Sequence, residues 1–214
     1  GNTFREAGVG FTVTSMQGTI DDTVFEKTAI GIGLAGATVQ MANSVFKDAP
    51  KDWKAIDFSA GEVTLINCPF GPDRINLPKP LPKTDKPLVT AMDFLILKVN
   101  GPLPEDSQVD VRTTNPVPPL PPGAADLNVR NAPAAIVGGR TPMPQSLSPI
   151  ILRWWVIDKD GKTTPAPDYT VRVLAPAEGE KPPKVLKTLT VKPDVKWFRP
   201  KPNDPAPTVE VSLK

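Results

Sequence analysis

The sequence predicts a mainly β protein, built as an antiparallel β-sandwich (immunoglobulin-like or jelly-roll-like) with one N-terminal helix and long proline-rich connections. Three observations predict this class. Short stretches of alternating apolar and polar residues recur along the chain, as in half-buried strands. Proline accounts for 28 of the 214 residues, against a usual share of about 5%, and it is confined to edges, turns and extended connections. The third observation is a strand–turn–strand pattern over residues 149–176.

This strand–turn–strand pattern gives the clearest structural prediction. Apolar residues alternate over residues 150–156 and again over residues 169–173. Between them, Asp158 and Gly161 tolerate the positive φ that a chain reversal needs. Alternate carboxylates in the turn are also a feature of calcium loops, but Tyr169 stands where such a loop has its glutamate. We therefore interpret residues 158–161 as a hairpin turn.

The N-terminal region begins with a predicted strand over residues 9–16. Val9, Phe11 and Val13 share one face of it. A helix is predicted next, over residues 22–46, because its apolar residues roughly follow three- and four-residue steps. Three glycines weaken this helix by about 1 kcal/mol each relative to alanine, so a loop or a strand is the alternative for its middle part.

Those glycines form a literal G-x-G-x-x-G motif over residues 31–36. A dinucleotide site needs a buried strand before the motif and a helix that starts at it. Here the preceding residues are themselves helix-like, so we interpret the glycines as sites of close packing against a neighbouring element. The alternative is an apolar glycine- and alanine-rich segment that inserts into a membrane or a neighbouring subunit.

The remaining strands are short and separated by polar or proline-rich connections. Residues 47–58 read as a loop, and no internal repeat is detected. Further strands are predicted over residues 62–67, 88–100, 108–113, 185–191 and 208–213, with a short pair within 126–137. We therefore divide the chain into an N-terminal β-rich region (1–113), a proline-rich connection (114–149) and a C-terminal hairpin with further strands (150–214). The last region completes one shared sandwich.

The residues that carry most chemistry are scarce. The chain has no histidine, which excludes serine–histidine hydrolysis, most zinc catalysis and histidine-ligated haem. Its single cysteine, Cys68, cannot form an internal disulfide and is expected to be a small buried apolar residue. We therefore predict that the chain is not an enzyme and binds no cofactor or metal.

The charges are balanced, with 25 basic and 23 acidic residues for a net charge of +2, so no nucleic-acid partner is predicted. No stretch approaches the ~18 apolar residues of a membrane span. The first residue, Gly1, suggests a processed mature form. Proline- and lysine-rich tracts such as 77–83 resemble ligands of polyproline-binding grooves, but we interpret them as rigid connectors.

These features predict a structural protein, a self-assembling subunit of an extracellular filament or surface layer. Proline-rich arms can cross between subunits with little loss of entropy, and a terminal strand can add to a neighbour's sheet. The alternatives are a virion coat or decoration protein and a monomeric immunoglobulin-like binding module. We expect copies of the chain itself as partners, no small-molecule substrate, and a location outside the cell, on its surface or in a virion. The predicted subunit interface consists of Val9, Phe11, Val13, Ile151, Trp155 and Ile157.

Overall fold

The computed structural model describes residues 2–113, 128–129, 132–133, 140–142, 147–165, 167–193 and 208–213. These residues form strands and one short 3-10 turn, with no α-helix among them. The mainly β composition is confirmed, but the antiparallel sandwich is wrong. The strands pair mostly in parallel and stack into a β-solenoid of about four coils.

Residue contacts divide the chain into two units. The first holds the solenoid and includes residues 2–93 and 153–165; the second includes residues 94–113, 147–152, 167–193 and 208–213. The strands of the solenoid are β1 (Asn2–Arg5), β2 (Val9–Thr14), β3 (Gln17–Asp21), β4 (Thr23–Glu26), β5 (Ile30–Ala42), β6 (Val45–Lys47), β7 (Lys54–Ile66), β8 (Ile75–Asn76) and the start of β9 (Val89–Asn100), with the 3-10 turn η1 (Pro72–Arg74) before β8. The other strands are β10 (Gln108–Thr113), β11 (Asn128–Val129), β12 (Ala132–Pro133), β13 (Arg140–Pro142), β14 (Leu147–Ile157), β15 (Thr163–Pro165), β16 (Tyr169–Leu174), β17 (Val185–Val191) and β18 (Thr208–Ser212).

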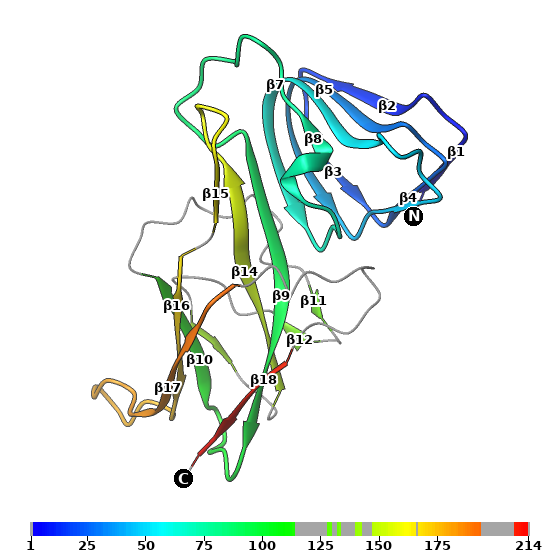
Figure 1. Ribbon diagram of the computed structural model, residues 1–214. Coiled ribbons are helices and arrows are strands. Elements are labelled where there is room, and N and C mark those ends of the chain that lie inside the picture. Colours follow the sequence, from blue (N-terminus) through cyan, green and yellow to red (C-terminus); the bar gives the residue numbers. More distant parts are fainter. Residues whose placement is uncertain are drawn as a thin grey trace. The chain divides into compact units, whose positions relative to one another are not determined.

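The coils of the solenoid stack in register, and the stacking reveals a sequence repeat. In one sheet, β1 pairs with β4 and β4 with β6, so that Phe4, Phe25 and Phe46 align at intervals of 21 residues. In the larger sheet, β2 and β3 both pair with β5, again at a spacing of 21 residues, and β5 pairs with β7 at 24. Figure 1 shows these strands running side by side. The prediction that the chain has no repeat is therefore wrong.

Columns of apolar side chains form the core of the solenoid. One column is Phe11, Ile32 and Ile56, and the last two are no more than 1% exposed. Residues at alternate positions of a strand face inward. Because the coils pair in register, each coil adds one side chain to every column, one strand spacing further along the stack. The other inward columns are Val13, Leu34 and Phe58; Val39 and Val63; and Ile20, Met41 and Leu65.

Residues with positive φ turn the chain at the corners of the coils. Glu6, Lys27 and Asp48 occupy one corner at 21-residue spacing, with φ of 51°, 51° and 48°. The corner backbone remains hydrogen-bonded to the next coil: the amide of Glu6 donates to the carbonyl of Glu26 at 2.9 Å. A second corner is occupied by Asp22, Asn43 and Asn67, residue types that tolerate this conformation better than most.

The helix predicted over residues 22–46 is wrong, because this stretch is β4, β5 and β6. Its apolar residues recur on the inward face of a strand, and a corner at Gly36, with φ of 71°, interrupts the strict alternation. Asp22, the first residue of the predicted helix, is a corner residue with φ of 50°. The G-x-G-x-x-G motif lies within β5 and precedes no helix, so it lacks the setting of a dinucleotide site.

Close packing does explain Gly31 of that motif, although in a strand rather than a helix. A Cβ at this position would lie 2.4 Å from Cζ of Phe46 and 2.8 Å from the carbonyl oxygen of Ala55. One coil earlier, a Cβ at Gly10 would meet Phe25 in the same way, at 2.7 Å. Glycine at these two positions therefore leaves the room that the stacked rings occupy.

The second unit contains an antiparallel four-stranded sheet in the order β13-β10-β16-β17. Asp110 on β10 is fully buried and accepts hydrogen bonds from Nε of Arg172 on β16 and from Nε of Arg112, both at 2.8 Å. Burial opposes ionisation of this carboxyl, but the hydrogen bonds and charges of the two guanidinium groups outweigh burial and lower its pKa. In the same unit, β18 pairs in parallel with the second half of β9.

The turn predicted over residues 158–161 is confirmed, but its second strand is not. Oδ1 of Asp158 accepts hydrogen bonds from the amides of Asp160 and Lys162, and β14 pairs across the turn with the short strand β15. Residues 169–174 form β16, which pairs with β10 and β17 instead. The loop predicted over residues 47–58 ends early, because β7 begins at Lys54. Most of the predicted connection 114–149 lies outside the described residues, so that division stays a prediction.

Candidate functional site

The N-terminal end of the solenoid is open. β1 pairs only with β4, and β2 and β3 pair only with β5, so among the described residues nothing pairs with their outer edges. These strands have 4, 6 and 5 residues. Backbone amides and carbonyls on a free edge are a template for pairing with another strand. We name this surface, the outer edges and exposed end of β1, β2 and β3, the open end.

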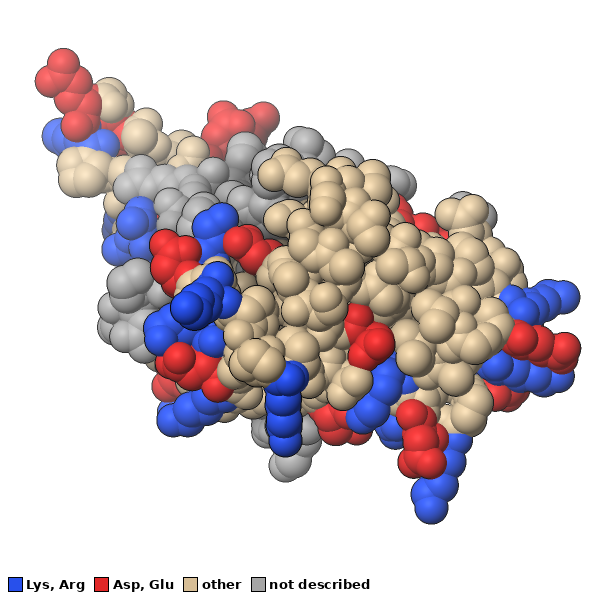
Figure 2. All heavy atoms as spheres, turned by 90° about the horizontal axis from the view of Figure 1, so that it is seen from above, with Lys and Arg blue, Asp and Glu red and all other residues tan. Residues whose placement is uncertain are grey.

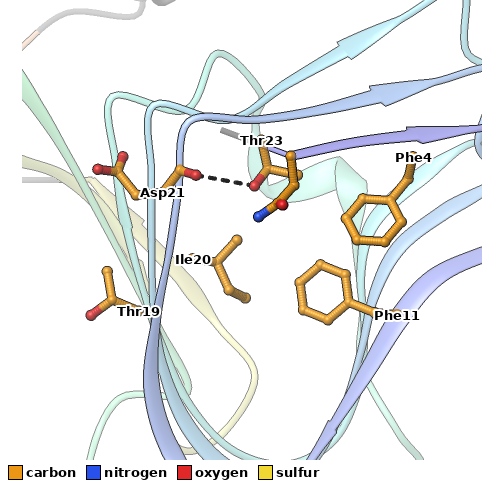
Figure 3. A pocket seen from close by; sticks show the side chains of 7 residues that line it. Phe4, Phe11, Thr19, Ile20, Asp21 and Thr23 are labelled. Carbon is orange, nitrogen blue, oxygen red and sulfur yellow. Dashed lines mark hydrogen bonds between the residues drawn. The ribbon is translucent and has the colours of Figure 1, made fainter.

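A pocket of about 220 Å³ lies at the open end. Figure 3 shows the rings of Phe4 and Phe11 next to each other on one side of it and Ile20 facing them. The hydroxyl of Thr23 donates to the carbonyl of Asp21 at 3.2 Å. The remaining lining residues are Asn2, Thr19 and Asp21 itself. Polar and apolar side chains thus both line the pocket, a composition that suits contact with another amphipathic strand or coil.

The two aromatic residues that line the pocket belong to the end of the solenoid core. Phe4 stacks on Phe25 with ring centroids 5.6 Å apart, and Phe25 stacks on Phe46 at 4.8 Å. Phe11 joins the stack beside Phe4 at 5.1 Å. Inside the stack Phe25 is fully buried, whereas Phe4 and Phe11 are partly exposed because no coil covers them. The open end therefore presents the same side chains that hold the coils together.

The charged side chains of β1 and the corner that follows it are paired within the chain. Nε of Arg5 lies 2.9 Å from Oε2 of Glu26, and Nζ of Lys27 lies 3.1 Å from Oε1 of Glu6. Such exposed pairs contribute at most about 1 kcal/mol each. Figure 2 shows basic and acidic side chains interspersed over the face it presents, with a broad area that carries neither. Nothing on that face resembles the continuous basic stripe of a nucleic-acid site.

The predicted interface residues fall into two groups. Val9 is 44% exposed, Phe11 is half-buried and Val13 is 8% exposed, and all three lie on β2 at the open end. Trp155 and Ile157 lie on β14 and are buried within the chain at 7% and 2% exposure. The backbone of Ile151 is part of β14, but its side chain lies outside the described residues. In the sheet β9, β7 and β5 lie between β14 and β2, so Trp155 and Ile157 do not lie beside the three residues of β2.

Sequence reasoning missed Phe4 and Ile20, which line the pocket beside Phe11. The signal was present in the spacing of the phenylalanines at 4, 25 and 46. A search for a period of 21 residues would have aligned three coils and placed Phe4 and Ile20 in the first of them.

Cys68 provides no reactive thiol. Burial raises the pKa of Cys68 to about 12, and its Sγ donates weakly to the carbonyl of Met41 at 3.4 Å. The corresponding residues of the two earlier coils, Thr23 and Ser44, donate to the carbonyl two residues before them, as Cys68 also does at 3.5 Å. The prediction that Cys68 is a small buried residue is confirmed. At this corner its thiol makes the contact that the hydroxyls of Thr23 and Ser44 make in the two earlier coils.

The described part of the chain contains no group of three or more side chains placed to hold a metal ion. It also contains no helix long and apolar enough to cross a membrane. The chain was compared with protein-family models, with curated proteins and with solved structures, and none of the three comparisons found a match.

Proposed function

We propose that this chain is a structural subunit that assembles with copies of itself into an extracellular filament or surface layer. The open end carries the proposal, because it combines unpaired strand edges with partly exposed core side chains. Assembly would proceed by adding a strand to the edge and by burying apolar groups of the pocket. A virion coat or decoration protein would use the same contacts.

The free energies expected for these contacts indicate a moderate affinity between subunits. Full burial of a side chain such as Phe4, Phe11 or Ile20 contributes roughly 1.5–3 kcal/mol, and these three are already half-buried. Each added backbone hydrogen bond contributes about 0.5–1.5 kcal/mol net. Association costs at least about 4 kcal/mol in lost freedom of motion. We therefore expect association that depends on protein concentration.

Sedimentation velocity tests the proposal. The average mass of the purified chain should rise above the 23.0 kDa of one copy as the concentration increases from micromolar to submillimolar values. Negative-stain microscopy of the associated fraction should then show filaments, sheets or closed particles. A chain that stays monomeric over this range, in low and moderate salt, contradicts the proposal.

Deleting the first coil is a poor test of the same idea. Removal of residues 1–21 would make Phe25, Ile32 and Met41 the new end of the stack, with the same kind of side chains in the same columns. The truncated chain should therefore present a new open end. Substitutions at the edge of the first coil are more informative.

A further inference from the structure

We propose that the four-stranded sheet of the second unit carries a binding site for an oxyanion, namely a sulfate, phosphate or carboxylate group, held by the guanidinium groups of Arg112 and Arg172. Asp110 is a positioning residue of this site, because it holds both guanidinium groups in place. The inference goes beyond the proposed function, since it requires neither the open end nor the association of subunits.

Strand alternation and register gather these side chains on one face of the sheet. Val109 and Val111 are fully buried on one face of β10, so Asp110 and Arg112 belong to the other face. Arg172 on β16 lies directly opposite Asp110 in the antiparallel register, and opposite residues share a face. Figure 1 shows β10, β16 and β17 side by side.

This face has an excess of positive charge. Asp110 contributes one negative charge, whereas Arg112 and Arg172 contribute two positive charges. On the other side of β10, β13 places a third arginine, Arg140, opposite Asp110. Asp168, the residue before β16, is itself paired with a lysine at 3.1 Å. An anion that approaches the two arginines therefore meets a net positive field.

Asp110 fixes the two guanidinium groups without using all of their donors. Nε of Arg112 donates to Oδ1 of Asp110 and Nε of Arg172 to Oδ2, both at 2.8 Å, and Nη2 of Arg172 also donates to Oδ2. A guanidinium group has five N–H donors in one plane. Within the described residues, these two side chains make no other hydrogen bond or ion pair. Both terminal nitrogens of Arg112 and one of Arg172 are therefore left for another acceptor.

The remaining donors are accessible from solvent, although their anchor is not. The side chain of Arg112 is 49% exposed and that of Arg172 is 34% exposed, whereas that of Asp110 is fully buried. Thr170 and Thr188 occupy the register positions opposite Arg112 and Arg172, and their hydroxyls can also donate.

The geometry of the free donors determines the class of ligand. The edge of a guanidinium group matches the paired oxygens of a carboxylate, sulfate or phosphate with two parallel hydrogen bonds. Because Asp110 already holds both groups, less side-chain freedom is lost when the anion binds than at two unanchored arginines. The ligand that fits this face is therefore an oxyanion.

Titration of the whole chain with inorganic sulfate tests the site. The Nε–H signals of the arginines, observed by NMR on isotope-labelled protein, should include two that shift with sulfate and reach saturation. Sodium chloride at the same ionic strength should not produce these shifts, because chloride cannot accept two parallel hydrogen bonds from one guanidinium edge. Parallel titrations with phosphate and acetate identify the oxyanion that binds most tightly.

Arg112→Gln is the informative variant, because Arg112 contacts Asp110 through one nitrogen and Arg172 still pairs with the buried carboxylate. It should weaken sulfate binding at least about tenfold, as expected when charge-assisted hydrogen bonds are lost. Arg112→Lys keeps the charge but loses the planar fork, so it should also weaken binding. Lys187→Gln is the matched control. It removes the same charge from β17 at the position opposite Val173, hence on the other face of the sheet, and should leave binding unchanged.

Two results would overturn the inference. One is the absence of a saturable shift with all three oxyanions. The other is equal weakening by Arg112→Gln and Lys187→Gln, which would indicate attraction by net charge alone. Circular dichroism checks that each variant is folded, and if Arg112→Gln does not fold, the wild-type titration and Arg112→Lys decide. The proposed function is tested separately by sedimentation, so either idea can fail without the other.

Discussion

Gly61 provides the sharpest test of the solenoid. It lies within β7 at the corner where the neighbouring strand β5 has its irregular pairing, and its φ is 116°. A Cβ there would lie 2.0 Å from the carbonyl oxygen of Ala37 and 2.8 Å from its amide nitrogen. A backbone conformation of this kind costs a non-glycine residue about 1–3 kcal/mol, and overpacking adds about 1–3 kcal/mol. Gly61→Ala should therefore destabilise the protein by about 2–6 kcal/mol.

Thermal unfolding measures this effect, because each kcal/mol lowers the Tm of a chain of this size by roughly 2–4 °C. Two glycines serve as matched controls. Gly36→Ala introduces strain alone, since φ is 71° but no atom lies closer than 3.7 Å, and Gly8→Ala introduces neither strain nor contact. The loss of stability should follow the order Gly61, Gly36, Gly8. A Tm for Gly61→Ala equal to that of Gly8→Ala would show that β7 does not pass the corner as described.

Three further predictions concern the core, the thiol and pH. Phe25→Ala should cost about 3–5 kcal/mol in denaturant unfolding, because a fully buried ring is removed; a loss below about 1 kcal/mol would contradict the stacked core. Cys68→Ser should keep the free energy of unfolding within about 1 kcal/mol of the wild type, since Ser44 makes the corresponding contact one coil earlier. The native thiol should resist alkylation at neutral pH until the chain unfolds, because its pKa is raised to about 12. The lowered pKa of Asp110 stabilises the folded state above the usual carboxyl pKa of about 3.9, and this contribution should be lost as the pH falls through the lower folded value. Asp110→Asn should remove that pH dependence, as denaturant unfolding from pH 5 to lower pH would show, and an unchanged acid transition would refute it.

Local alternation predicted individual strands well. The strand over residues 9–16 corresponds to β2, the one over 88–100 to β9, and those over 108–113, 185–191 and 208–213 to β10, β17 and β18. Period-two patterning depends only on which face of a strand is buried, and short segments of sequence record it. The presence of each of these strands could therefore be predicted from a short segment of sequence.

The partner with which each strand pairs could not be predicted from such short segments. A strand in a parallel stack pairs with residues 21 or 24 positions away, and its local pattern is the same as in a sandwich. The corner within β5 also misled the prediction. Positive φ at Gly36 shifts the alternation of inward and outward residues, so the apolar residues of β5 fall at intervals typical of a helix. The long-range spacing of Phe4, Phe25 and Phe46 was the missing observation.

Two of the predicted interface residues lie at the candidate site. Val9 and Phe11 were selected because they alternate on a terminal strand, and both lie at the open end. Trp155 and Ile157 are apolar residues of one strand that the sequence places in the interface, and in the structure the chain itself buries them. The sequence alone does not tell whether such residues are buried by their own chain or by a partner.

Because each of the first coils repeats the cross-section of the one before, the number of coils can vary independently of the rest of the stack. Gain or loss of one whole 21-residue unit would lengthen or shorten the stack by one strand spacing, about 4.8 Å. A single residue gained or lost within a strand would turn the following side chains of that strand outward, because strand faces alternate with period two. Extra residues at a corner do not have this effect, since β5 and β7 pair at a spacing of 24 residues with the same columns facing inward. Length variants that keep the core should therefore differ by complete coils or by residues at the corners.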